Sequence, residues 1–311
     1  MTTSAETGQH GEAHGRHSAG SEQGVIHDIG YRHYKGRRLG RGYVARSLLV
    51  DSLRGTYGLG RSARSKVMPM LLGALMCLPA LVMVIVVNAT GADRLPLAYT
   101  DYAFRLQTVV AIFVAAQAPQ LVSRDLRFHT MPLYLSRPPH RIDYVLAKYA
   151  AMTGALLILL AVPLLIMYAG ALLAHLPTWD QTRGLLQGLA GAVLFALVLT
   201  GIGLLIAALT PRRGLGIAAI ITVLLVATAV GGVTNGIAQD QGAHTLAGYA
   251  GLLGPFTLVD GLQTWLFGTV PNVPPGPPGT LGGPVFALVA GVIVLGSFGL
   301  MLLRYRRVSV S

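Results

Sequence analysis

Few side chains in this sequence have the types and spacing that catalysis or nucleotide binding requires. A phosphate-binding loop ends in Gly-Lys-Ser or Gly-Lys-Thr, so that backbone amides and the lysine meet the phosphates. The three lysines, Lys35, Lys66 and Lys148, each follow a residue other than glycine, which excludes ATP binding by that motif. A His-Glu-x-x-His run is also missing. We therefore expect a protein that is not an enzyme and has no catalytic residues.

Metal and thiol chemistry have little support. His10, His14 and His17 have the spacing of metal ligands on a helix, but they lie in residues 1–30, a segment rich in Gly, Ser, Glu and Gln. A segment of this composition buries too little apolar surface to fold, so we expect a disordered tail. Cys77 is the single cysteine, which excludes an internal disulfide and a cysteine-based zinc site. We expect no metal and no cofactor.

The most informative pattern is the polar run 123–148, between two apolar blocks. A short helix beginning near Ser123 would place Asp125 in its first turn, where a carboxylate is favoured. Leu133 and Leu135 alternate with polar neighbours, and a pair of prolines ends the element before a new helix begins. A simple turn between two helices would not require so regular a residue pattern.

The run resembles the cytoplasmic loop of type-2 ABC exporter permeases, the membrane subunits of ATP-driven exporters. That family has an acidic residue, an Arg, a Gly-Thr, a Leu-rich element, a Ser-x-Pro and an Arg before a Gly-Lys that enters the third span. The residues that match in order are Asp125, Arg127, Thr130, Leu133, Leu135, Ser136, Pro138, Arg141 and Lys148. Three positions depart from the pattern: His129 replaces the usual Gly, Ala147 replaces the second Gly, and Asp125 replaces a commoner Glu.

The resemblance implies a mechanism and two kinds of partner. Two such permease subunits, identical or paralogous, pair with each other, and each inserts its Ser123–Arg141 loop into a cleft on a separate ATP-binding subunit. Closure of those subunits on ATP then moves the spans and carries the substrate outward. An alternative is that the cations of the loop only set the topology and bind anionic lipid.

Apolar blocks must position this loop. The chain is 53% hydrophobic and 12% charged, and the charged share is about half that of a soluble protein. Crossing the hydrocarbon layer takes about 20 apolar residues, and six segments are nearly or wholly free of charge over such a length. They are Val67–Val87, Phe104–Val122, Tyr149–Ala174, Leu185–Leu209, Leu215–Asn235 and Val285–Leu303. We therefore predict an all-α integral membrane protein with six transmembrane helices.

The basic residues predict the orientation. Six spans place 21 of the 24 lysines and arginines on one side, and only Arg94, Arg105 and Arg183 on the other. The cation-rich side is expected to be cytoplasmic, so both termini are cytoplasmic. The many arginines indicate a GC-rich bacterial genome and hence a bacterial plasma membrane. The cations are not interleaved with aromatic residues, which argues against nucleic acid as a partner.

Two further elements complete the predicted organisation. The range Thr245–Thr269 is apolar but is interrupted by Pro255 and Asp260, and a full crossing there would place the C-terminal arginines outside. We predict an outer-face helical hairpin between spans five and six, either re-entrant or lying on the surface. The basic segment 31–66 contains an apolar stripe over Tyr43–Tyr57, which predicts an amphipathic interfacial helix, with an ordinary soluble helix as the alternative. Residues 67–311 then form the permease domain.

We therefore predict the permease subunit of an ATP-driven exporter. The spans contain few aromatic residues, which favours a lipid-like or drug-like substrate. A membrane assembly or scaffold subunit without transport activity is the alternative. A stand-alone ion-coupled transporter is disfavoured because the spans lack buried carboxylates. The weakly polar residues within the spans are expected to act as contacts between helices more often than as substrate ligands. They are Asn88, Gln107, Gln117, Gln120 and Thr200.

Overall fold

The described part of the protein is helical throughout its regular structure. The structure is a computed structural model that describes residues 40–60, 63–127, 141–210 and 212–308, with the backbone alone at 123–127, 141 and 306–308. The helices are α1 (Arg41–Thr56), α2 (Ala63–Thr90), α3 (Tyr102–Arg105), α4 (Gln107–Arg127), α6 (Arg141–Leu173), α7 (Thr178–Leu209), α8 (Arg213–Asp240), α9 (His244–Ala250), α10 (Pro255–Phe267) and α11 (Gly279–Val308). The predicted tail, residues 1–30, lies outside the described ranges.

Five described helices, α2, α6, α7, α8 and α11, are long and apolar enough to cross a membrane. At 1.5 Å per residue, even the 28 residues of α2 extend about 42 Å, more than the hydrocarbon layer of about 30 Å. The prediction of an all-α, multi-pass membrane protein is confirmed to this extent. The remaining predicted span, Phe104–Val122, corresponds to α4, whose described apolar stretch Gln107–Val122 is shorter than the other five.

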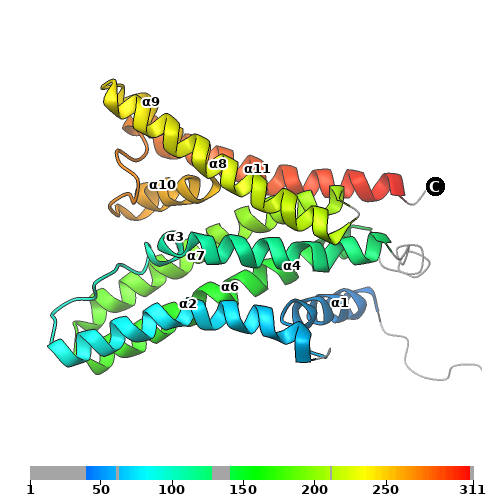
Figure 1. The fold of residues 1–311 in the computed structure, drawn as a ribbon, viewed down its shortest axis with the longest axis horizontal. Helices are drawn as coiled ribbons and strands as arrows, with labels where there is room; N and C mark the ends of the chain where they lie inside the picture. Colours follow the sequence, from blue (N-terminus) through cyan, green and yellow to red (C-terminus); the bar gives the residue numbers. More distant parts are fainter. Residues whose placement is uncertain (1–39, 61–62, 128–140, 211, 309–311) are drawn as a thin grey trace, which may run out of the picture. The chain divides into compact units, whose positions relative to one another are not determined.

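The long helices alternate in direction (Figure 1). The chain passes along α2, returns along α4, and repeats the alternation through α6, α7, α8 and α11. The end of α4 and the start of α6 consequently lie at the same end of the bundle as α1, the α7–α8 turn and the end of α11. We call this the arginine-rich end. The opposite end, where α9 and α10 lie, is called the hairpin end.

Helix α7 is the centre of the bundle, because it packs against α4, α6, α8, α10 and α11. Its glycines permit this close packing. A Cβ atom on Gly203 would lie 2.6 Å from Val114 Cγ1 of α4, and one on Gly191 would lie 2.7 Å from the side-chain amide of Gln263 on α10. Small residues at such positions let helix backbones approach in a membrane, where apolar side chains gain little by leaving lipid.

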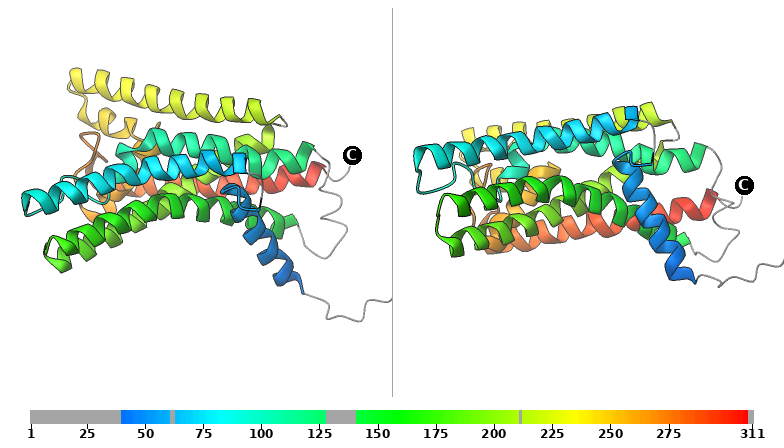
Figure 2. Two further views of the ribbon diagram at one scale, coloured as in Figure 1. Left: turned by 60° about the horizontal axis from the view of Figure 1, so that its bottom comes forward. Right: turned by 90° about the horizontal axis from the view of Figure 1, so that it is seen from below.

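Helix α1 covers most of the apolar stripe Tyr43–Tyr57, for which an amphipathic interfacial helix was predicted. Leu48, Leu53 and Tyr57 of this stripe pack against the hydrophobic core of the bundle. The Tyr57 hydroxyl donates a hydrogen bond of 2.8 Å to the backbone carbonyl of Ala155 on α6. Helix α1 is inclined to the long helices (Figure 2) and contacts α4 and α6, the two helices on either side of the predicted coupling loop.

Two short helices occupy the range 245–269, for which a hairpin was predicted. Helix α9 packs on α8, and α10 packs on α11, α7 and α8. Gly254 precedes Pro255 at the start of α10, and Gly268 ends that helix in a left-handed conformation, with φ of 68°. The chain then reaches α11 through an irregular connector, residues 268–278. Helix α11 begins at Gly279, six residues before the predicted span.

Candidate coupling site

The predicted coupling residues fall at the junction of α4 and α6. The backbone at Asp125 and Arg127 forms the last turns of α4, and Arg141 begins α6. The side chains of these three residues lie outside the described part of the structure. So do the entire residues Thr130, Leu133, Leu135 and Pro138. What the structure describes is the helical frame from which the loop extends.

An ion pair connects α1 to the start of α6 beside this loop. Arg41, the first residue of α1, donates two hydrogen bonds to Asp143 in the first turn of α6, from Nε at 2.5 Å and Nη2 at 2.8 Å. The bidentate geometry is that of the stronger arginine–carboxylate pairs. The hydrogen bond to Asp143 raises the pKa of Arg41. Sequence reasoning missed this pair, although an acidic residue in the first turn of a helix was an available signal.

Lys148 is the one predicted coupling residue whose side chain is described. It is 7% exposed, and its ammonium nitrogen lies 5.5 Å from the centre of the Tyr144 ring one turn earlier on α6. Tyr144 in turn packs edge-on against Tyr305 of α11, with the ring centres 5.4 Å apart. The charge of Lys148 therefore lies next to the Tyr144–Tyr305 contact between α6 and α11.

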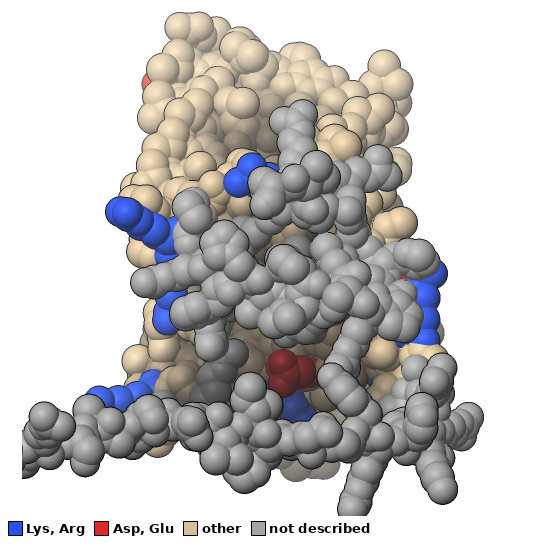
Figure 3. All heavy atoms as spheres, turned by 90° about the vertical axis from the view of Figure 1, so that its right-hand side faces the viewer, with Lys and Arg blue, Asp and Glu red and all other residues tan. Residues whose placement is uncertain are grey.

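The arginine-rich end is strongly cationic. Figure 3 looks onto this end, where blue lysine and arginine side chains appear at several separate places. Among side chains that the structure describes there, nine cations stand against two carboxylates, those of Asp51 and Asp143. The cations are Arg41, Arg46, Arg54, Arg64, Lys66, Lys148, Arg212, Arg213 and Arg304. Such a surface is attracted to anionic headgroups and to the acidic groups of a protein partner.

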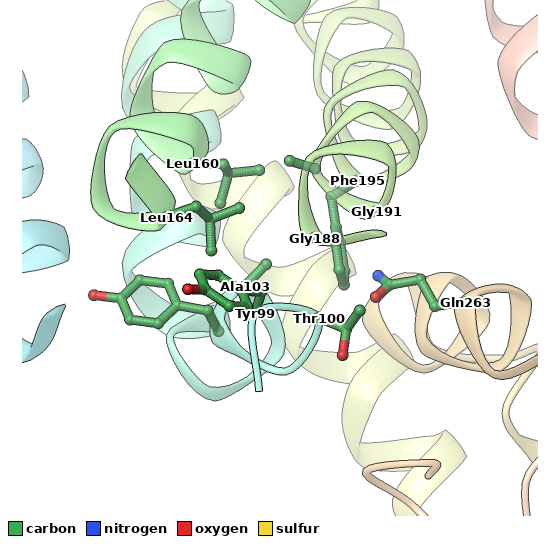
Figure 4. A pocket seen from close by; sticks show the side chains of 11 residues that line it. Tyr99, Thr100, Ala103, Leu160, Leu164, Gly188, Gly191, Phe195 and Gln263 are labelled. Atoms are coloured by element: carbon green, nitrogen blue, oxygen red, sulfur yellow. The ribbon is translucent and has the colours of Figure 1, made fainter. Parts of the chain in front are cut away.

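The opposite end carries different polar features. A gap between α3, α6, α7 and α10 is lined by Thr100, Leu160 and Gly188, and the Gln263 side chain points from α10 toward α7 (Figure 4). This gap is packed too closely to hold a water molecule. A more open cavity of about 280 Å³ lies beside it, between the α2–α3 segment, α7 and Thr269.

Polar residues within the bundle separate into two classes. Asn88 of α2 donates a hydrogen bond of 3.3 Å to the backbone carbonyl of Gly170 on α6, which is the contact between helices expected of it. Gln117 of α4 and Thr200 of α7 are both completely buried. Within the described ranges, the amide nitrogen and oxygen of Gln117 have no hydrogen-bond partner, and neither has the hydroxyl of Thr200. A buried amide without partners destabilises the fold.

We expect Gln117→Leu to raise the thermal stability of the detergent-purified protein. Leucine removes an unpaired amide whose burial costs about 1–3 kcal/mol, while it keeps a side chain of similar size in the core. Thermal unfolding followed by circular dichroism measures the change.

Asn88→Leu is the comparison at an exposed position. The Asn88 amide is hydrogen-bonded to the Val84 and Gly170 carbonyls, so its loss should lower the unfolding temperature. Equal destabilisation by both substitutions would contradict the prediction, because it would mean that the Gln117 amide contributes as much to stability as a hydrogen-bonded one.

Comparison with family models and with curated proteins finds no match to this chain.

Proposed function

We propose that this protein is the permease subunit of an ATP-driven exporter, coupled through the loop 123–148 to a separate ATP-binding subunit. The observation that carries the proposal is the order of acidic, Arg, Leu and Pro residues in this loop, at the cation-rich end of a membrane bundle. Cations alone would serve lipid binding equally well, but lipid binding does not require the Asp125, Leu133 and Pro138 pattern.

Helices α4 and α6 are the elements through which loop movement reaches the bundle. Both continue from the loop into the core, where α4 packs on α7 and α8, and α6 packs on α2 and α7. The Arg41–Asp143 pair fastens α1 to the first turn of α6, so a force on the loop displaces α1 and α6 together. Different contacts of the loop with the ATP-bound and ATP-free partner supply the free energy that shifts the bundle.

The proposal includes the finer topology. Six spans, α4 among them, place both termini in the cytoplasm of a bacterium and α9–α10 at the outer face of its plasma membrane. The 49 residues from Asn235 to Gly283 contain no lysine or arginine, as an outer segment should. Two copies, or this chain and a paralogue, pair around the substrate route, and the substrate is lipid-like or drug-like.

Co-purification tests the proposal. The tagged chain is expressed together with its neighbouring reading frames, purified in detergent, and assayed for bound ATPase. An exporter permease retains an ATPase subunit whose sequence contains a Gly-Lys-Ser or Gly-Lys-Thr phosphate loop. The alternative function, a scaffold subunit, predicts a different result. The retained partners would lack a phosphate loop, or they would bind equally well after residues 123–148 of this chain are replaced.

Labelling tests the topology separately. In a Cys77→Ala background, a cysteine at Ser311 should react with a membrane-impermeant maleimide only after the cells are opened. A cysteine at exposed Val270 in the connector should react in intact cells. Labelling of Ser311→Cys in intact cells would contradict the six-span topology and the exporter proposal with it.

A further inference from the structure

A pair of carboxylates shares one amide at the hairpin end. Asp260 of α10 is 6% exposed and accepts two hydrogen bonds from Asn272 of the connector, one from the backbone N–H at 2.9 Å and one from the side-chain Nδ2 at 2.8 Å. The same Nδ2 also lies 3.2 Å from Oδ1 of Asp101, the residue before α3. The two N–H groups of one neutral amide therefore bridge two acidic groups.

No cation compensates these carboxylates in the described part of the chain. Arg105, four residues after Asp101, is exposed and forms no ion pair with either aspartate. The other residues that line the space around Asp260 come from α8, α9, α10, the connector and α11, and they are uncharged. They include Asn235, Thr257, Val273 and Phe286. Among the residues that the structure describes, Asp101 is the charged group that acts on Asp260.

Ionisation of Asp260 is therefore costly. Burial raises its pKa, the hydrogen bonds from Asn272 and Val273 lower it in part, and the neighbouring Asp101 raises it further, with a net rise. A carboxyl group with a raised pKa holds its proton more tightly in the closed structure than in an open one. The closed structure is therefore stabilised below the raised pKa and loses that stabilisation as the pH rises through it.

The three residues join separate parts of the fold. Asp260 belongs to the hairpin, Asn272 to the connector that leads into α11, and Asp101 to the start of α3, which is followed directly by α4. Gln263, one turn after Asp260, lies against Gly191 of α7 at the closed gap of Figure 4. Opening these hydrogen bonds would free the connector from α10 and α3 beside that gap.

We propose that Asp260, Asn272 and Asp101 form a proton-operated latch that holds the connector closed at the hairpin end. With one proton on the pair, the repulsion between the carboxylates is relieved and Asn272 remains bound to both. With both carboxylates ionised, Asn272 separates from α10 and its amide becomes accessible to water, while the Pro274 carbonyl of the connector still accepts hydrogen bonds from Asn235 and Gln239 of α8. Acidification closes the latch and alkalinisation opens it. The latch does not depend on the proposed function.

Hydrogen exchange of the connector tests the latch in the purified wild-type protein without any ATPase subunit. The Asn272 amide hydrogen bonds directly to Asp260 and reports opening. After correction for the intrinsic pH dependence of exchange, its exchange should accelerate as the pH rises above about 4, the ordinary pKa of an aspartate, and level off above the raised pKa of Asp260. The acceleration should be up to about tenfold for each unit of raised pKa. In Asp260→Asn, which is neutral at every pH, the corrected rate should be constant.

Two more variants keep the test decisive. Asp240→Asn removes an exposed carboxylate at the same end of the bundle and should retain the wild-type pH dependence. Asp101→Asn removes the repulsion, so the transition should move to lower pH. A corrected wild-type rate that does not change with pH, or a transition that persists in Asp260→Asn, would overturn the latch. Failure to bind an ATPase would leave this result unaffected.

Discussion

Reversing the two charges at the end of α4, in the double variant Asp125→Lys/Arg127→Glu, should abolish retention of the ATP-binding subunit. Charged groups at a docking surface are matched to groups of opposite sign, and placing like charges together costs several kcal/mol. Each 1.4 kcal/mol corresponds to a factor of ten in affinity. We expect at least about a tenfold loss of co-purified ATPase, measured as ATP hydrolysis per tagged permease.

The control for this experiment is Arg213→Glu, at the start of α8. Arg213 lies at the same arginine-rich end and is exposed, but it does not belong to the loop pattern. If the loop serves only to enrich positive charge, the double variant, which keeps the net charge, should leave lipid binding unchanged. Arg213→Glu, which replaces a positive charge by a negative one, should weaken lipid binding, and neither variant should have a specific effect on the ATPase. Undiminished retention of the ATPase by the double variant would refute coupling through this loop.

The second large effect is expected at Gly58, in the turn that ends α1. Its φ of +69° is in the left-handed region, and the following Leu59 N–H donates a hydrogen bond to the carbonyl of Arg54, as in a glycine-terminated helix. A Cβ atom there would lie 2.5 Å from the backbone carbonyl oxygen of Ser65 on α2. Because the obstacle is the backbone of a helix, no side-chain rotation can relieve it.

Gly58→Val should therefore detach α1 from the bundle. The left-handed conformation costs a β-branched residue about 1–2 kcal/mol, and the overlap with α2 adds about 1–3 kcal/mol. We expect a clearly lower unfolding temperature and faster proteolysis at Arg46 and Arg54, measured in detergent by thermal unfolding and limited trypsin digestion.

Gly60→Val is a matched control two residues later. Gly60 also has a positive φ, 82°, but nothing lies within 4 Å of the position of its Cβ. It should show only the conformational cost, about 1–2 kcal/mol. Equal destabilisation at both positions would mean that the contact of Gly58 with α2 contributes nothing to the packing of α1.

The helices themselves could be predicted from local sequence. Charge-free runs such as Leu185–Leu209 predict spans because the cost of moving charge into hydrocarbon is a property of the residues and not of the fold. The apolar stripe of α1 could also be found locally, because helical spacing of apolar residues is a property of the sequence. The boundaries were less predictable. Helix α6 begins at Arg141, eight residues before the predicted span, because helical hydrogen bonding continues where apolar composition ends.

The pairings between helices were decided only by the tertiary structure. Arg41 and Asp143 are 102 positions apart, and Asp101 and Asn272 are 171 apart. Such partners depend on how the helices pack, which in turn depends on glycines such as Gly191 and Gly203 whose neighbours no local pattern identifies. The sequence alone determined which segments are helical and apolar and which carry the cations. Only packing decided which distant polar groups meet, because their energies depend on distance and burial, and both are properties of the folded bundle.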